Sequence, residues 1–248
     1  MEDLNREYYL TDSPGRADYW RFMAAPRFRL ETFLTEISDS SPGAIVDLGC
    51  GSGLLLAAMR RRFPESRLCG MDFSDTLIES SRRADPSIDW RLADLGMPQI
   101  FEQGLASSFD VVLASEIIEH VENPEVLLAN AARLAKPKTG LLLLSTQSGR
   151  IWETERMVGH RRHFSALEVR ALLEASGWTP RRIWNAGFPF HTFAKWSANL
   201  FPQRTMRSFS ERSYGLLQRS VCFFFRMLYR FNMKSRGAQL FAVAERAP

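Results

Sequence analysis

A glycine-rich turn follows a short apolar run near the start of the chain, in the sequence IVDLGCGSG of residues 45–53. Glycines at this spacing allow a tight turn and let a ligand approach the backbone without meeting a Cβ atom. In the dinucleotide pattern GxGxxG the third small residue would fall at Leu54, which is not small. Asp47 precedes the first glycine by two residues, and its carboxylate would repel a pyrophosphate and attract an ammonium group. The turn therefore favours a cofactor with an amino-acid part over a nicotinamide dinucleotide.

Acidic and hydroxyl side chains follow three later apolar runs, where each expected strand ends. Asp72 closes the second run and is placed to accept hydrogen bonds from both hydroxyls of a ribose. Asp94 follows the third and can accept from an adenine amine, with Leu95 packing on the ring. Ser115 and Glu116 follow the fourth. Each acid alone could be a helix N-cap or a loop residue, but ligands of α/β proteins bind at this edge of the sheet.

The elements that must position these residues alternate between strand and helix, which is typical of a mostly parallel sheet covered on both faces. Strands are expected at residues 44–48, 67–71, 88–92, 109–114, 141–145, 181–185 and 239–245. Helices are expected at residues 17–37, 54–63, 76–84 and 124–136, and from a capping box at Ser165 to Gly177.

Composition indicates a globular chain of one large α/β domain with additions. The 248 residues are 45% hydrophobic and 24% charged, with a net charge of +4. Three separated cysteines predict neither a disulfide framework nor a zinc site, and a reducing cytoplasm is the expected location. We expect no signal peptide and no membrane-spanning helix. Runs of two or three arginines are dispersed along the chain. We interpret them as solvated helix faces, with a surface attracted to nucleic acid or anionic lipid as the less favoured alternative.

These segments resemble class I S-adenosylmethionine (SAM)-dependent methyltransferases, and most of all the branch of ubiquinone-biosynthesis O-methyltransferases and small-molecule methyltransferases. The matching pieces are IVDLGCGSG, GMDFS, RLADL, FDVVLASEIIEHVENP and HRRHFSALEVRALLEASGW. The resemblance covers roughly residues 27–184. It implies a Rossmann-like α/β fold, with a seven-stranded, mostly parallel sheet whose last strand is antiparallel, and SAM as cofactor. An arginine before the first strand often binds the SAM carboxylate in this branch, and its spacing falls on Arg29, with Arg27 as the alternative.

The predicted cofactor-binding residues, from the turn, the strand ends and the resemblance together, are Arg29, Asp47, Gly49, Gly51, Gly53, Asp72, Phe73, Asp94, Leu95, Ser115 and Glu116.

Methyl transfer from a sulfonium is an in-line displacement, so the protein mainly aligns the reactants, and a base is needed only if the acceptor loses a proton. His120 and His163 are the candidate catalytic bases, and each could instead be a packing or loop residue. In ubiquinone-pathway relatives the acids and the histidine of one segment have been assigned to a divalent metal, and the matching residues are Glu116, Glu119 and His120. A metal is not expected here, since many relatives with this segment need none.

Four segments are expected: an N-terminal helical lid (1–40), the SAM-binding core (41–186), an aromatic helical cap (187–238) and the last strand (239–248). We interpret most aromatic residues of the cap as its packed core, with some forming an apolar pocket for the acceptor. The candidate substrate residues are Tyr9, Trp20, His160, Phe190 and His191. Residues 213–234 place arginines beside phenylalanines, which suits either burial or peripheral contact with a membrane surface.

The predicted function is methyl transfer from SAM to an oxygen, less favoured a nitrogen or carbon, of a small apolar or aromatic acceptor, by a monomer or homodimer. A lipid-linked, protein or RNA acceptor is the alternative, with RNA the less favoured, and a non-catalytic SAM-binding protein is another. The motif of amino-methylating DNA enzymes, Asp/Asn-Pro-Pro-Tyr/Phe, is replaced by Ser115-Glu116-Ile117-Ile118, which disfavours DNA. A nicotinamide dehydrogenase is disfavoured by the spacing of the glycines.

Overall fold

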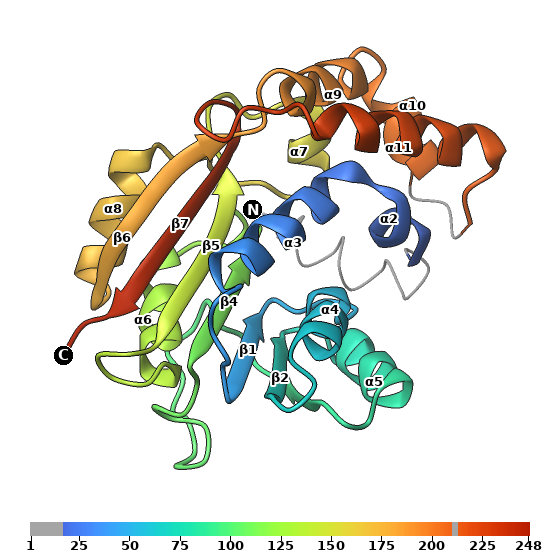
Figure 1. Ribbon diagram of the computed structural model, residues 1–248. Helices are drawn as coiled ribbons and strands as arrows, with labels where there is room; N and C mark the ends of the chain where they lie inside the picture. The colour runs from blue at the N-terminus through green and yellow to red at the C-terminus, as the bar shows by residue number, and fades with distance from the viewer. Residues whose placement is uncertain (1–16, 210–212) are drawn as a thin grey trace.

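The computed structural model describes residues 17–209 and 213–248 and contains one seven-stranded sheet, in the order β3-β2-β1-β4-β5-β7-β6 (Figure 1). β7 runs antiparallel to both β5 and β6, and the remaining pairs are parallel. The strands are β1 (Ala44–Leu48), β2 (Arg67–Asp72), β3 (Asp89–Leu92), β4 (Val111–Ser115), β5 (Leu141–Gln147), β6 (Trp178–Ala186) and β7 (Gln239–Arg246). This confirms the predicted fold class.

Helices cover both faces of the sheet, which explains why its central strands β1, β4 and β5 are buried along nearly their whole length. The helices are α2 (Ala17–Phe22), α3 (Ala24–Glu36), α4 (Leu54–Arg62), α5 (Asp75–Ala84), α6 (Pro124–Leu134), α7 (Glu153–Met157), α8 (Ala166–Ala175), α9 (Phe190–Ala198), α10 (Pro202–Phe209) and α11 (Leu216–Tyr229). Leu128 of α6 and Leu173 of α8 belong to the core on one face, and Phe33 of α3 and Met59 of α4 to the core on the other. α3 covers the second face and places Arg29 beside Glu116, the residue that follows β4.

The single helix expected over residues 17–37 is wrong, because the chain breaks between α2 and α3 at Met23. Met23 has extended backbone angles (φ −62°, ψ 139°). Pro26 explains the break: inside a continuous helix its ring would clash with the carbonyl of Phe22, whereas in a first turn it costs nothing. The capping box at Ser165 is present as expected, and Ser165 Oγ accepts from Glu168 N.

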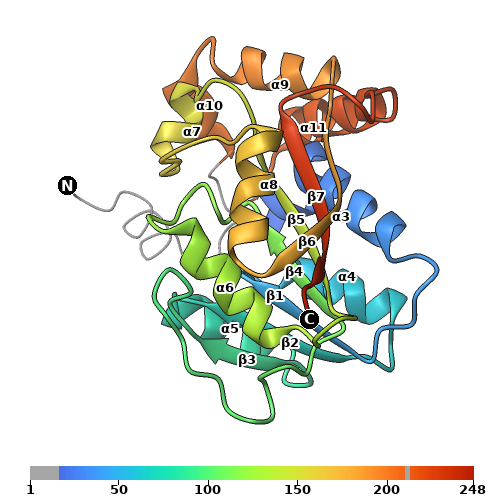
Figure 2. The same ribbon diagram turned by 90° about the vertical axis from the view of Figure 1, so that its left-hand side faces the viewer.

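Helices α9, α10 and α11 lie between β6 and β7 in the sequence and gather in space at the end of the sheet toward which β4 and β5 point (Figures 1 and 2). α11 packs against α2, α3 and α9, and α10 against α7. The expectation that most aromatic residues of this segment form a packed core is wrong. Seven of them are exposed: Phe188, Phe193, Trp196, Phe201, Phe223, Phe224 and Phe231. Among the described residues, no helix is both long and apolar enough to span a bilayer.

Candidate active site

The glycine turn after β1 needs its three glycines for different reasons. All three have positive φ angles: Gly49 69°, Gly51 50° and Gly53 74°. A Cβ at Gly49 would lie 2.6 Å from Ile117, and one at Gly53 would lie 2.3 Å from Trp90. A Cβ at Gly51 would meet no atom within 4 Å. Gly49 and Gly53 therefore permit close packing, whereas the space beside Gly51 is open to a ligand.

Asp72, at the end of β2, connects that strand to the glycine turn. Its Oδ2 accepts from Gly51 N (2.9 Å) and its Oδ1 from Ser74 N (3.0 Å). Burial raises the pKa of Asp72, although these amide donors counteract the effect. Asp47 lies beneath the turn and is 3% exposed; burial, and then Asp72, raise its pKa well above the usual range. Two acids are thus held beside the turn, where a cation would relieve their repulsion.

The predicted adenine-binding residues follow β3. Asp94 is half-buried, and its Oδ1 accepts from Gly96 N (3.1 Å). Leu95 is buried in the core on the α6 side, so its side chain offers almost no surface to a ring. Phe73 follows Asp72 and is half-buried. The contacts of all three with a cofactor stay predictions.

Glu116 directly follows β4 and is the centre of a buried polar cluster. Its φ of 53° is unusual for a residue other than glycine, and such strain is often found at functional sites. Arg29 Nη1 lies 3.7 Å from Glu116 Oε2, and Gln147 and Gln239 donate to the two carboxylate oxygens at 2.5 and 2.8 Å. Burial raises the pKa of Glu116, but Arg29 and the two amides outweigh burial and lower it to about 2.

The structure distinguishes the two arginines considered for the cofactor carboxylate. Arg29 is buried and faces Glu116 at the sheet edge. Arg27 points elsewhere and donates to the backbone oxygen of Arg21 (2.6 and 3.0 Å). The preference for Arg29 therefore has a geometric basis.

Gln147 and Gln239 were not predicted as site residues from the sequence, although they lie at the same edge of the sheet as the predicted acids. Gln147 is the last residue of β5, and Gln239, the first residue of the antiparallel β7, is paired with it. A glutamine at the end of one apolar strand and another at the start of the last strand are the features of the sequence that could have indicated this pair. The predicted Ser115 shares a hydrogen bond with Ser145 across the edge (Oγ–Oγ 3.1 Å).

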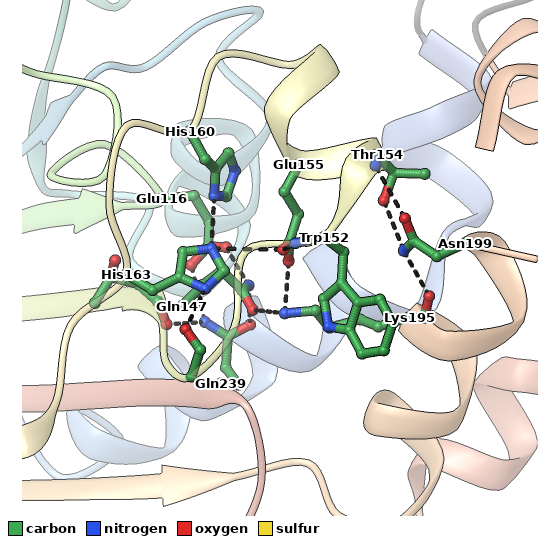
Figure 3. A network of polar contacts seen from close by, with 12 residues as sticks. Glu116, Gln147, Trp152, Thr154, Glu155, His160, His163, Lys195, Asn199 and Gln239 are labelled. Atoms are coloured by element: carbon green, nitrogen blue, oxygen red, sulfur yellow. Dashed lines mark hydrogen bonds and ion pairs between the residues drawn. The ribbon is translucent and has the colours of Figure 1, made fainter.

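A second part of the network joins two histidines to the helices above the sheet (Figure 3). His160 Nδ1 lies 3.1 Å from His163 Nε2, and His163 Nδ1 lies 3.2 Å from the carbonyl oxygen of Gly149. Glu155 of α7 lies 3.6 Å from His163 Nε2 and pairs with Lys195 of α9 at 2.5 Å. Lys195 Nζ also donates to Gln147 Oε1 (2.9 Å), which couples the cap to the cluster around Glu116.

These contacts determine the tautomers of the two histidines. A carbonyl oxygen only accepts, so His163 Nδ1 carries the proton. Burial is the largest effect lowering the pKa of each histidine, that of His160 to about 2, which favours the neutral form of both. Neutral His163 therefore accepts at Nε2 from His160 Nδ1–H. It follows that His160 Nε2 has no proton and is able to take one.

His160 and His163 differ in their neighbours. The His163 side chain is only 2% exposed, whereas the His160 ring packs edge-on against His120, with centroids 4.6 Å apart. His120 N donates to Ile117 O, and Ile117 lies against Gly49. A chain of contacts thus links the glycine turn, through Ile117 and His120, to the ring of His160. The structure therefore brings His160, predicted as a substrate residue, together with the predicted bases His120 and His163; their roles stay predictions.

The metal-ligand set considered from the sequence is not the set that the fold brings together. Among the described residues, ligand atoms approach within 4.8 Å in two groups: Glu119, His120 and His160, and Glu155, His160 and His163. Glu116 belongs to neither, because Arg29 and the two glutamines occupy its carboxylate. Glu119 Oε1 is buried with no hydrogen-bond partner among the described residues. A carboxylate and two imidazoles suit a divalent transition metal, so the first group would be the one to hold such an ion.

The remaining candidate substrate residues lie in the cap and at the N-terminus. Phe190, at the start of α9, is half-buried, and its backbone N donates to Asn232 Oδ1 (2.9 Å). His191 is 3% exposed and packs against Tyr229. The backbone of Trp20 belongs to α2, but its side chain lies outside the described part of the chain, as does all of Tyr9.

We expect the variant His191→Gln to become more stable relative to the native chain as the pH falls. Burial, and then Lys195, lower the pKa of His191 to about 3, against an ordinary value of 6.5. Below pH 6.5 the unfolded native chain gains a proton that the folded chain refuses, which favours unfolding; glutamine gains none. From about pH 7.5 to about pH 5 the difference in unfolding free energy should shift by roughly 2 kcal/mol toward the variant. Urea unfolding at both pH values measures it, and a constant difference would contradict the prediction.

Comparison with known proteins decides the family. A family model described as a methyltransferase domain matches residues 19–183. The chain belongs to this methyltransferase family. The match confirms the resemblance to class I SAM-dependent methyltransferases predicted from the sequence. The ubiquinone biosynthesis O-methyltransferase of Maricaulis maris is 40% identical over 108 residues, which cover 41% of this methyltransferase chain and 39% of that protein.

Solved structures agree on the fold. A putative methyltransferase of Haloferax volcanii, solved with the methyltransferase activator Trm112, has a TM-score of 0.64 at 18% identity and matches 98% of both chains. The 1,6-didemethyltoxoflavin-N1-methyltransferase of Burkholderia thailandensis, solved with S-adenosylhomocysteine, has a TM-score of 0.61 at 14% identity, over 99% of this chain and 88% of that one. This methyltransferase chain spans less than half the length of the Maricaulis relative.

Proposed function

We propose that the chain transfers the methyl group of SAM to a hydroxyl oxygen of a small, largely apolar or aromatic acceptor, with His160 as the base. The observation that carries the proposal is the contact between His160 Nδ1 and His163 Nε2 (3.1 Å), from which we infer that Nε2 of His160 carries no proton. Oxygen acceptors of the phenol or alcohol type must lose a proton during transfer, whereas the sulfonium itself needs no activation.

SAM would lie along the glycine turn. Asp72 would hold the ribose hydroxyls, Asp94 would hold the adenine amine, and Arg29 and Asp47 would hold the carboxylate and the ammonium group of the methionine part. Open space beside Gly51 supports this placement. Gly49, Gly53, Phe73, Ser115 and Glu116 would shape or line the same site. Each of these roles is a proposal.

The proton taken by His160 has a route away from the acceptor. Protonation of His160 at Nε2 lets its Nδ1 proton move to His163 Nε2, beside the carboxylate of Glu155. Glu116 adds a second negative charge that favours the protonated form of His160. The family and the match to O-methyltransferases support this reading, as does the exposed aromatic cap beside the site.

The test is transfer from methyl-labelled SAM to a panel of acceptors: phenols, aliphatic alcohols, amines and carboxylic acids, each in apolar and charged forms. We expect calorimetry to show SAM binding and label to appear in apolar phenols or alcohols. If SAM does not bind, the assignment of the cofactor fails. If SAM binds but only amines or carboxylic acids are labelled, the choice of acceptor and of His160 as the base fails.

A further inference from the structure

The outer side of α11 carries a row of exposed apolar side chains. Leu216 is 85% exposed, Phe223 64%, Phe224 57%, and Phe231, just beyond the helix, 71%. Residues three, four or seven positions apart share a helix face, so these side chains form one broad outward stripe. The opposite side of the helix packs against the rest of the protein through buried residues such as Tyr229. An exposed apolar stripe of this kind marks a surface that meets another apolar phase.

A pocket of about 290 Å³ adjoins this stripe. Its walls are Arg21, Phe22, Arg27, Arg219, Phe223 and Arg226, so α2, α3 and α11 all contribute.

The four arginines of the pocket have few anionic partners of their own. Within residues 17–209 and 213–248, the one ion pair made by any of them joins Arg219 to Asp18 (3.6 Å). The guanidinium groups of Arg21 and Arg219 also lie 5.3 and 5.1 Å from the ring centre of Phe22. Burial, and then the charge of Arg226, lower the pKa of Arg27, which shows that the cations repel one another. The pocket is therefore complementary to an anion.

Further positive charge lies along α11 on the side that faces the pocket. Arg219, Phe223, Arg226 and Arg230 follow one another at helical spacing, and form the edge between the pocket and the apolar stripe. Cations along one edge of an exposed apolar stripe are the pattern of a helix that lies in the plane of a membrane interface. The arginine stems can pack on apolar surface while their guanidinium groups stay at the depth of the headgroups.

We propose that α2 and α11 together dock on the surface of a bilayer that contains anionic phospholipids. In what we term the docking face, the pocket of Arg21, Arg27, Arg219 and Arg226 receives lipid phosphates, and the stripe of Leu216, Phe223, Phe224 and Phe231 enters the acyl boundary. A nucleic acid would match the arginines but would leave the apolar stripe in water. The inference does not depend on which acceptor is methylated.

The experiment is co-sedimentation of the full chain with vesicles. Vesicles of phosphatidylcholine alone are compared with vesicles of phosphatidylcholine and phosphatidylglycerol, in low and in high salt. We expect strong binding to the anionic vesicles, weaker binding to the neutral ones, and a decrease with salt because exposed charges are screened. Free inorganic phosphate at the same phosphate concentration should not displace the protein, because it offers no acyl phase.

Two variants separate the two halves of the docking face. Arg226→Gln removes a pocket cation that makes no ion pair among the described residues, and should weaken binding to anionic vesicles about fivefold. Phe223→Ser/Phe224→Ser removes two exposed rings and should weaken binding to both kinds of vesicle, on the order of tenfold or more. The matched control is Leu167→Ser/Arg83→Gln, which makes the same kinds of change at exposed positions of α8 and α5, and should bind like the native chain.

Three outcomes would overturn the proposal. The first is no binding of the native chain to anionic vesicles. The second is equal binding by the control and by both variants of the docking face, provided that all of them unfold at the same temperature as the native chain. The third is a native chain that forms a stable dimer in analytical ultracentrifugation and binds no vesicles, while the variant Phe223→Ser/Phe224→Ser is a monomer. That result would mean that a second copy of the chain covers the stripe.

Discussion

The variant His160→Ala is expected to transfer methyl groups up to about 10² times more slowly than the native chain, the lower end of the usual contribution of a positioned base, because the pKa of His160 is lowered to about 2 and lies far below the working pH. Its affinity for SAM should not change, because His160 lies against His120 and His163 and not along the glycine turn. Single-turnover assays with labelled SAM measure the chemical step, and calorimetry measures SAM binding.

Two controls test whether His160 acts on the acceptor or only supports the fold. His163→Gln keeps an oxygen that accepts from His160 Nδ1–H, so it should lose much less activity than His160→Ala. Asp89→Asn changes a polar residue at the start of β3 that lies away from the site, and should turn over at nearly the native rate. Equal losses in all three variants would point to a structural role and would contradict the proposal.

The pH profile gives an independent check on the same residue. With its pKa lowered to about 2, His160 stays neutral, so its own titration should not reduce the rate between about pH 8 and pH 5. A rate that falls on the acid side with an apparent pKa near the ordinary histidine value of 6.5 would mean that the base is a more exposed group.

Replacing Asp72 with asparagine is expected to weaken SAM binding on the order of 100-fold. Hydrogen bonds to a charged group contribute about 1.5 to 3 kcal/mol each, and the carboxylate is proposed to accept from two ribose hydroxyls. In the native chain Gly51 N and Ser74 N both donate to the carboxylate of Asp72. The NH₂ group of an asparagine would face one of these donors, so that hydrogen bond would be lost as well. Calorimetric titration with SAM measures the loss.

The matched control for this variant is Asp89→Asn, at the start of the neighbouring strand β3. Asp89 pairs with Arg91 and lies at the far end of its strand from the site. Its replacement should leave the affinity for SAM unchanged, with a similar far-UV circular dichroism spectrum for both variants. If Asp72→Asn binds SAM as tightly as the control does, the ribose contact is wrong, although the family assignment would still hold.

The sequence by itself determined the fold, the family and the positions of the acids at the strand ends. These features depend on short-range patterns: an apolar run sets a strand, three glycines set a turn, and the next residue after a parallel strand must lie at the carboxyl edge. For that reason Asp47, Asp72, Asp94 and Glu116 could be placed without coordinates. The break at Met23 was also encoded locally, by Pro26, and was missed.

Only the tertiary structure decided the partners of these residues. Glu116 meets Gln239 because β7 inserts antiparallel between β5 and β6, and His160 meets Lys195 through Glu155 and His163 because the cap folds over the sheet edge. The arginine pocket likewise needs α2 and α11, from opposite ends of the chain. Such contacts depend on how distant segments pack, and periodicity along a sequence carries no information about which polar groups will then face one another. The sequence could therefore predict where the cofactor should lie, whereas the proposed base, the candidate metal-ligand group and the proposed docking face depend on packing.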